Sequence, residues 1–332
     1  MIERMRADNG LKDVILLSGN GVDDFEFIEK CQNLLPRLKA VVMENTALNP
    51  LTWRYFHMLE ECSYIFLQHG PTFWKMAPKH ISAFAVANYV NVASESEKEF
   101  LEKYVPVHWE TGRKPRYLIA GLPRWDLLKD ESGSEREKVV FYMPTWRAAF
   151  NSGMDTIAKS AYFTGVRGLV SAENIERLKK KGLRLVMAAH HHLVNHVKNL
   201  DFGLPVELVP QSEISYWIRH ASLCVTDYSS VSFDFLFLDK PCIFWTPDRY
   251  DGLLQGDDYA EVIFAEHQGK NMFNRVGRVG DVMEMIERYA DSGFVLEPEK
   301  REIAERFFAC RHNVCERLYG QICAIDGKEV AQ

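Results

Sequence analysis

Leu223-Cys-Val-Thr-Asp-Tyr-Ser-Ser-Val-Ser-Phe-Asp-Phe235 begins as an apolar strand that stops at Thr226 and Asp227, before a hydroxyl-rich helix start. A strand that leads directly into a helix is the repeating unit of a parallel α/β sheet. The free N–H groups and the positive end of the helix dipole favour an anion at such a turn. Since Thr226, Ser229 and Ser230 add hydroxyl donors, the turn is predicted to bind a phosphate. The competing interpretation is that Asp227 or Ser229 only caps the helix.

Asp234 lies about one turn further along this helix. Its carboxylate is a candidate acceptor for ribose or polyol hydroxyls, and a surface or supporting role is the alternative.

The same alternation of short apolar runs and longer amphipathic stretches continues along the whole chain, which is typical of βα units around parallel sheets. The predicted strands are 14–17, 40–43, 64–67, 89–92, 117–120, 139–143, 184–189, 223–226 and 241–245, and the predicted helices of the second half are 172–181, 212–220 and 229–238. Residues 129–138 are polar and charged, without an apolar face, so they are predicted to form a linker. We therefore expect two parallel-sheet α/β domains, 1–130 and 138–332, that face a cleft.

Composition restricts the class of protein further. The chain has 332 residues, 47% of them hydrophobic and 26% charged, which is typical of an ordered protein of about two domains. Its formal net charge of -6 argues against general nucleic-acid binding, which needs a surplus of Lys and Arg. There is no apolar signal-peptide core and no run of about 18 apolar residues, so an intracellular protein is expected. Its seven cysteines form no C-x-x-C pair, and an odd number favours free thiols.

His69 and Gly70 follow directly on a predicted strand, at the edge of the sheet where ligands bind. An imidazole titrates near neutral pH, and Gly70 allows a substrate close to the backbone. His69 is thus the first candidate for a general base. A histidine that only bonds to a neighbouring loop is the alternative.

A second set of histidines follows the strand 184–189, and it consists of His190, His191 and His192. Together with His196 they suggest a metal site, but no Glu completes an H-E-x-x-H motif and no metal is predicted. His190 directed at a phosphate is the preferred interpretation, because an imidazole N–H donates to an oxyanion.

Two further loops follow strands, at 120–126 and 142–147. Their Arg124 and Arg147 are candidates to clamp a phosphate, or to pair with surface carboxylates instead. The sequence contains no Walker A loop, no G-x-G-x-x-G and no G-x-S-x-G, which argues against the common NTPase, dehydrogenase and α/β-hydrolase classes.

In this order the segments resemble the CDP-glycerol glycerophosphotransferase family, the teichoic-acid primases and polymerases and related capsule-polymer enzymes. The matching residues are His69-Gly70, Gly121-x-Pro123-Arg124-x-Asp126, Pro144-Thr145-Trp146-Arg147, His190, Thr226-Asp227-Tyr228-Ser229-Ser230, Phe233-Asp234-Phe235, and Lys240-Pro241 with Phe244. The resemblance covers about residues 64 to 250 and, more weakly, the region near Arg317. The turn after His69 has Pro71 before Thr72 where the family has Thr before Pro, and His191 stands where Pro is usual.

The resemblance implies a GT-B fold of two Rossmann-like domains, with the nucleotide held mainly by the C-terminal one and a last helix that is a candidate to return to the first. It implies that His69 reaches the acceptor hydroxyl and that His190 contacts the pyrophosphate. The donor-binding candidates are Thr145, Arg147, Thr226, Asp227, Ser229, Ser230 and Asp234, and the further candidates are Gly70, Lys75, Arg124 and Asp126.

The reaction expected from the resemblance transfers a polyol phosphate from a CDP-linked donor to a hydroxyl, with release of CMP, in the synthesis of bacterial cell-wall or capsule polymers. CDP-glycerol is the first candidate donor, and other CDP-polyols or nucleotide-linked donors stay open. No cofactor is predicted, and a need for Mg²⁺ stays open because this ion often binds through substrate phosphates. A lipid-linked or oligomeric acceptor would bring the enzyme to the inner face of the membrane. The alternatives are a GT-B glycosyltransferase that uses a nucleotide sugar and a non-catalytic nucleotide-binding module.

Overall fold

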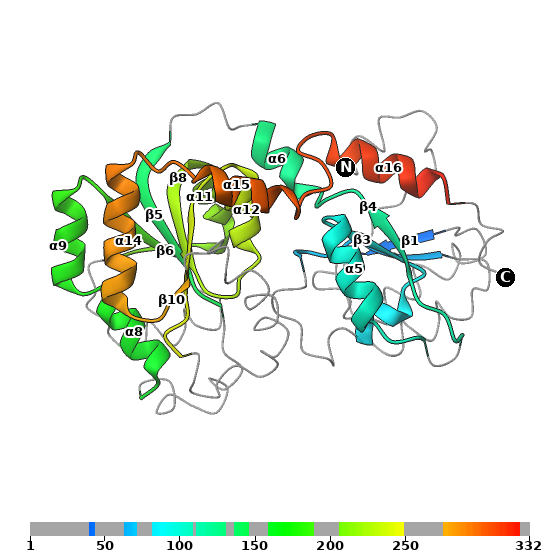
Figure 1. Ribbon diagram of the computed structural model, residues 1–332, viewed down its shortest axis with the longest axis horizontal. Coiled ribbons are helices and arrows are strands. Elements are labelled where there is room, and N and C mark those ends of the chain that lie inside the picture. Colours follow the sequence, from blue (N-terminus) through cyan, green and yellow to red (C-terminus); the bar gives the residue numbers. More distant parts are fainter. Residues whose placement is uncertain are drawn as a thin grey trace. The chain divides into compact units, whose positions relative to one another are not determined.

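Two α/β units are formed by the residues that the structure describes (Figure 1). The structure is a computed structural model, and it describes residues 40–43, 63–71, 82–108, 111–130, 136–145, 159–188, 206–248 and 275–325. Unit 1 contains the described residues up to Pro71, those from 82 to Asp126 and those from Phe307 onward, whereas unit 2 contains those from Leu127 to Arg306. The chain therefore leaves unit 1 within one helix and comes back to it for the last described segment.

Unit 1 is built on a parallel sheet with the strand order β1-β2-β3-β4. Its strands are β1 (Ala40–Met43), β2 (Ser63–Phe66), β3 (Tyr89–Val92) and β4 (Arg116–Ile119). Its other elements are the 3-10 helix η2 (Ser82–Val86), α5 (Glu95–Tyr104), the first turn of α6 (Arg124–Asp130) and α16 (Val314–Cys323). All residues of β2 and β3 are buried, as expected of a parallel sheet that is covered on both faces.

The start of α5 shows how local sequence sets an element of unit 1. The Ser94 hydroxyl accepts a hydrogen bond from the Glu97 N–H at 3.2 Å, and the Glu97 carboxylate accepts one from the Ala93 N–H at 2.6 Å. The Ser94 hydroxyl thus caps the first turn, and the Glu97 carboxylate reaches back as in a capping box, although it bonds the residue before the N-cap. This pair of bonds places α5 directly after β3.

The helix α16 covers the sheet of unit 1 from the far end of the described chain. Leu318 is fully buried in a cluster with Ile65, Tyr89 and Leu118 of three different strands. The Arg317 guanidinium also donates to the carbonyl of Ile119 at 2.8 Å, at the end of β4. The core of unit 1 thus depends on residues that are about 200 positions apart.

Unit 2 is built on a longer parallel sheet with the strand order β10-β9-β8-β5-β6-β7. Its strands are β5 (Glu137–Met143), β6 (Arg184–Ala188), β7 (Glu207–Val209), β8 (Ala221–Thr226), β9 (Cys242–Trp245) and β10 (Arg275–Val276). Its helices are α8 (Ala161–Leu169), α9 (Ala172–Lys180), η4 (Gln211–Glu213), α11 (Ile214–His220), α12 (Val231–Phe237), α14 (Val279–Asp291) and α15 (Pro298–Glu305).

Helices cover both faces of this sheet, with α8, α9 and α14 on one face and α11, α12 and α15 on the other (Figure 1). On the first face, α8 approaches β9 so closely that a Cβ on Gly165 would lie 2.9 Å from the Trp245 ring. On the second face, the rings of Phe141 and Phe235 stack at 6.1 Å. Both faces of β8 are therefore buried.

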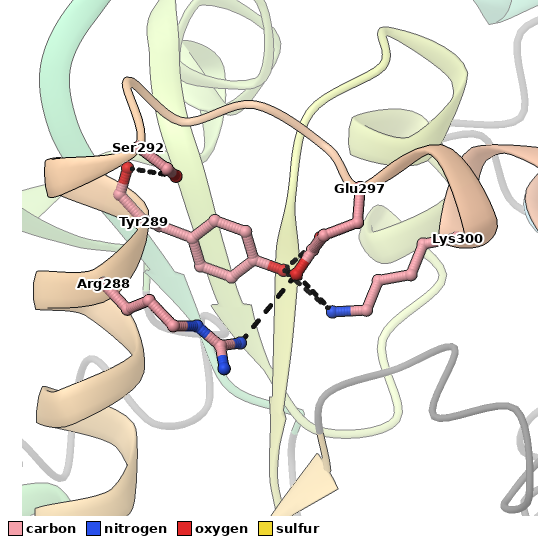
Figure 2. Close-up of polar contacts among 5 residues, drawn as sticks. All are labelled: Arg288, Tyr289, Ser292, Glu297 and Lys300. Carbon is pink, nitrogen blue, oxygen red and sulfur yellow. Dashed lines mark hydrogen bonds and ion pairs between the residues drawn. The ribbon is translucent and has the colours of Figure 1, made fainter.

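A polar cluster joins α14 to α15, with Tyr289 and Lys300 buried in it (Figure 2). The Tyr289 hydroxyl donates to the Glu297 carboxylate at 2.8 Å, and the Lys300 ammonium donates to the same carboxylate at 2.7 Å. Arg288 lies 3.8 Å from Glu297 at the exposed side of the cluster. Burial lowers the pKa of Lys300, although its pairing with Glu297 opposes that shift. The cluster ties the start of α15 to the C-terminal part of α14.

The two parallel-sheet α/β domains expected from the sequence are confirmed, and their predicted strands agree within two residues wherever the structure describes them. The predicted strand 14–17 lies outside the described residues. Of the predicted linker, the first residues belong to α6 and the last to β5, and residues 131–135 lie outside the described residues, so the domain boundary stays a prediction. None of the helices in the described parts of the chain is long and apolar enough to cross a membrane.

Candidate functional site

The turn between β8 and α12 is held by a buried carboxylate. Asp227 is 2% exposed and accepts hydrogen bonds from the Thr145 N–H at 2.9 Å, from the Tyr228 N–H at 2.6 Å and from the Thr145 hydroxyl. The Thr226 hydroxyl donates to the carbonyl of Met143 at 2.6 Å. These bonds tie the carboxyl ends of β8 and β5, which are neighbours in the sheet. Thr145, Thr226 and Asp227 are thereby brought together, and their contact with a donor stays a prediction.

Asp227 does not cap α12, so that part of the competing interpretation is wrong. The helix begins after Ser230, whose side chain makes no capping hydrogen bond, and the carboxylate of Asp227 is directed at the β5 loop instead. The Ser229 hydroxyl accepts a long bond of 3.4 Å from the Val231 N–H. Capping at this helix is therefore weak and comes from Ser229.

Half-buried donors remain on this turn. Within the residues that the structure describes, no acceptor bonds to the N–H groups of Ser229 and Ser230, and both residues are partly exposed. The Val231 N–H is bonded to the Ser229 hydroxyl, and the N–H groups of Ser232 and Phe233 are bonded to the carbonyls of Ser229 and Ser230. Two adjacent main-chain N–H groups and two hydroxyls can bind an anion, and the helix dipole of α12 adds to the attraction.

Asp234 lies on α12 and is 3% exposed, so the surface role considered for it is excluded. Every residue of α12 is buried. Its predicted contact with donor hydroxyls stays a prediction.

The Lys240-Pro241 motif has a structural role at the other end of α12. The Lys240 ammonium is buried, and it donates to the carbonyl of Ile218 at 2.9 Å and to that of Arg219, at the C-terminus of α11. Burial, followed by the repulsion of Arg136, lowers the pKa of this ammonium to about 7. The lysine thus anchors α11 to the loop before β9.

In unit 1, the turn that carries His69 leaves its side chain exposed between buried neighbours. Gln68 before it is buried and has a positive φ of 63°, and Gly70 after it is buried. The Gln68 amide donates to the main-chain carbonyl of Asn91 at 2.6 Å. The Asn91 amide donates in turn to the carbonyls of Leu67 at 3.2 Å and Gly121 at 2.8 Å. Sequence reasoning missed Gln68 and Asn91, because neither has a signal that separates it from an ordinary polar residue.

Arg124 and Asp126 contact other parts of unit 1. The Arg124 guanidinium donates to the main-chain carbonyl of His69. The Asp126 carboxylate accepts from the N–H groups of Val314 at 3.0 Å and Cys315 at 2.8 Å, and so it caps α16. A contact of either residue with the donor stays a prediction.

His190, Arg147 and Lys75 lie outside the described residues. Among the residues that are described, no three His, Cys, Asp or Glu side chains gather in a way that could hold a metal ion.

Comparison with solved structures identifies the fold. The wall teichoic acid polymerase TagF matches 98% of this chain and 81% of its own with a TM-score of 0.65 and 18% identity, and a variant of it has also been solved after a soak with CDPG. A UDP-GlcNAc 2-epimerase from Neisseria meningitidis, bound to UDP-GlcNAc, matches 93% of this chain and 84% of its own with a TM-score of 0.54 and 11% identity. The fold is therefore GT-B-like.

Sequence comparison identifies the family. The minor teichoic acid biosynthesis protein GgaB of Bacillus subtilis (strain 168) is 27% identical over 292 residues, which is 84% of this chain and 31% of that protein. The chain thus spans about a third of the length of this curated relative. The model of the CDP-Glycerol:Poly(glycerophosphate) glycerophosphotransferase family matches residues 27–311. Because this match covers most of the sequence, the chain belongs to the CDP-glycerol:poly(glycerophosphate) glycerophosphotransferase family.

Proposed function

We propose that this protein transfers a polyol phosphate, with glycerol phosphate as the first candidate, from a CDP-linked donor to an acceptor hydroxyl in teichoic-acid-type polymer synthesis. The match of the family model over residues 27–311 carries this proposal. The likeness in fold to a wall teichoic acid polymerase that was soaked with CDPG supports it.

The reaction is a displacement at phosphorus. The acceptor oxygen forms a bond to the phosphorus that carries the polyol, the bond from that phosphorus to the oxygen of CMP breaks, and CMP leaves with the bonding electrons. The acceptor hydroxyl loses its proton, and the product is a phosphodiester. Positioning of the reactants and stabilisation of charge on the phosphoryl oxygens supply most of the acceleration in this class of reaction.

The donor phosphates are assigned to the turn between β8 and α12. Within the described part of the chain, the N–H groups of Ser229 and Ser230 have no acceptor, so they and the two hydroxyls are candidate donors to a ligand. Thr145, Thr226 and Asp227 are also proposed donor-binding residues, and their mutual bonds give the turn its shape. His190 and Arg147 are proposed to contact the pyrophosphate, and Asp234 to accept from donor hydroxyls.

His69 is assigned the proton of the acceptor hydroxyl. Its imidazole is exposed at the end of β2, which suits a group that must meet a substrate. Gly70 and Lys75 are proposed to border the same substrate. A lipid-linked or oligomeric acceptor is the partner expected from this function, and it would place the protein at the inner surface of the membrane.

The test measures CMP release and donor binding separately. The purified protein is incubated with CDP-glycerol and an oligomeric poly(glycerol phosphate) acceptor, and CMP is measured while phosphorus NMR follows the phosphodiester. His69→Ala is expected to lower turnover at least ~100-fold, since general-base catalysis contributes about that factor, and to keep the donor Kd. His312→Ala is the matched control, because His312 is another exposed histidine of unit 1.

Unchanged turnover in His69→Ala would remove His69 from the mechanism. Turnover of a nucleotide sugar without a new phosphodiester signal would instead support a glycosyltransferase. Tight binding of CDP without turnover of any donor would support a binding module.

A further inference from the structure

We propose that Arg124 and Asn91 are positioning residues for His69, and that Arg124 acts on the main chain of this residue rather than on a phosphate. The inference rests on the proposed function, because it concerns the same imidazole. Asn91 belongs to β3 and Arg124 to α6. Together they bond to the consecutive residues Leu67, Gln68 and His69 of the turn.

Asn91 fixes the end of β2. It is fully buried in β3, between β2 and β4, and its side-chain amide donates to the carbonyls of Leu67 and Gly121 on either side. The reverse orientation of this amide would place its oxygen against two carbonyl oxygens, which repel it. The amide therefore has one favourable orientation, and one side chain ties the carboxyl ends of β2 and β4 across β3.

Gln68 changes the direction of the chain between Leu67, which Asn91 holds, and His69. Its φ of 63° lies in the left-handed region, which costs free energy for a residue other than glycine. The bond of 2.6 Å from its side-chain amide to the carbonyl of Asn91 helps to compensate this cost in the buried interior. The turn exposes His69 directly after a buried residue.

Arg124 fixes His69 itself. Its guanidinium donates to the carbonyl of His69, which is 55 positions away in the sequence. Arg124 is the first residue of α6, and its neighbours are packed against α16, because a Cβ at Gly121 would lie 3.3 Å from Val314 and because Asp126 is bonded to the start of α16. The turn is thus held at Leu67, Gln68 and His69 by groups that belong to well-packed elements.

These bonds to the main chain matter for the placement of the exposed His69 imidazole. His69 is exposed, and the position of its backbone sets the point from which the imidazole reaches a substrate. A misplacement of about 1 Å in a reacting group can lower a rate ~100-fold. Loss of the guanidinium is therefore expected to lower kcat while the donor, which is assigned to unit 2, binds as before.

The experiment compares Arg124→Met and Arg124→Lys with the matched control Arg136→Met. Arg136 also donates from an exposed position to a main-chain carbonyl, that of Leu238 at 3.4 Å, but in unit 2. The readouts are kcat and the donor KM from CMP release, the Tm, and the imidazole ¹H–¹⁵N signals of histidine-labelled protein, in which the His69 signal is identified with His69→Gln.

For Arg124→Met we expect kcat to fall about 10- to 100-fold with an unchanged donor KM, and the His69 signal to shift or broaden. Arg124→Lys restores part of kcat, and Arg136→Met changes neither kcat nor that signal. A raised donor KM with unchanged kcat and an unchanged His69 signal would overturn the proposal and make Arg124 a phosphate clamp. If the wild-type protein releases no CMP, the proposed function fails, whereas the His69 signal still decides whether Arg124 positions this residue.

Discussion

At the carboxyl edge of each sheet, one buried polar side chain ties neighbouring segments together, but the hydrogen bonds run in opposite directions. In unit 2 the buried carboxylate of Asp227 accepts hydrogen bonds and ties β8 to the loop after β5. In unit 1 the buried amide of Asn91 donates hydrogen bonds and ties β2 to the end of β4. The carboxylate organises main-chain N–H groups, whereas the amide organises carbonyls without adding a charge. The first arrangement suits a turn that presents N–H groups to an anion, and the second suits a turn that presents one imidazole.

The largest effect is expected when the carboxylate of unit 2 is removed. Asp227→Ala leaves the N–H and hydroxyl of Thr145 and the N–H of Tyr228 without their acceptor, and each buried donor without a partner costs about 1 to 3 kcal/mol. We expect the free energy of unfolding to fall by roughly 3 to 5 kcal/mol. Hydrogen exchange measured by mass spectrometry is expected to rise in β5 and β8 peptides.

Asp291→Ala is the control, because Asp291 pairs with Lys181 at 2.6 Å on the surface of the same unit, and such pairs contribute at most about 1 kcal/mol. A similar small loss in both variants would show that the Asp227 network does not hold the turn.

The next effect is expected when the amide of unit 1 is made acidic. Asn91→Asp keeps the shape of the side chain but replaces its two donations with repulsion between a buried carboxylate and two carbonyls. The expected loss is roughly 2 to 4 kcal/mol in the free energy of unfolding, with faster exchange confined to β2, β3 and β4 peptides.

Asn88→Asp is the matched control for this change. The exposed Asn88 side chain accepts from the Tyr64 N–H at 2.7 Å, and a carboxylate can accept the same bond. Equal losses in the two variants would contradict a special role for Asn91.

The smallest expected effect is a change with pH in the free energy of unfolding, and it arises from Lys240 in unit 2. Burial, with a further contribution from Arg136, lowers the pKa of Lys240 from 10.5 to about 7 in the folded protein. Between these values the unfolded chain binds a proton that the folded chain does not, so the free energy of unfolding rises with pH. Urea unfolding is expected to show a gain of about 1 to 2 kcal/mol between pH 7.5 and 9.

Lys240→Met removes the titrating group and is expected to flatten this dependence. The amides of Asn91 and Gln68 do not titrate, so their network contributes nothing to it. An equal slope in the wild-type protein and in Lys240→Met would assign the dependence to other groups.

Much of the fold could be predicted from local sequence, because parallel strands buried on both faces are continuous apolar runs. Leu223 to Val225 is such a run, hydroxyls follow it, and the structure has β8 and α12 over this segment. The strand β7 was missed, because two of its three residues are exposed at the edge of the sheet. The helix α8 was missed too, since Gly165 and Gly168 lower its helix propensity. The need for Gly165 is visible only in its close approach to Trp245.

For the candidate site, the sequence could predict only which residues follow the ends of strands, and not which residues hold them in place. His69 and Thr226 follow apolar runs, and this position indicated ligand binding. What holds them depends on residues far away in the sequence: Thr145 is 82 positions from Asp227, and Arg124 is 55 positions from His69. Bonds from a side chain to a distant carbonyl or N–H leave no periodic pattern, because any polar residue of suitable length can make them.

The crystal structure of the protein with bound CDP-glycerol tests the central claim most directly. We predict that an oxygen of the donor diphosphate lies within hydrogen-bond distance of the N–H groups of Ser229 and Ser230. A diphosphate bound only elsewhere, with the turn between β8 and α12 making no contact to it, would contradict the account.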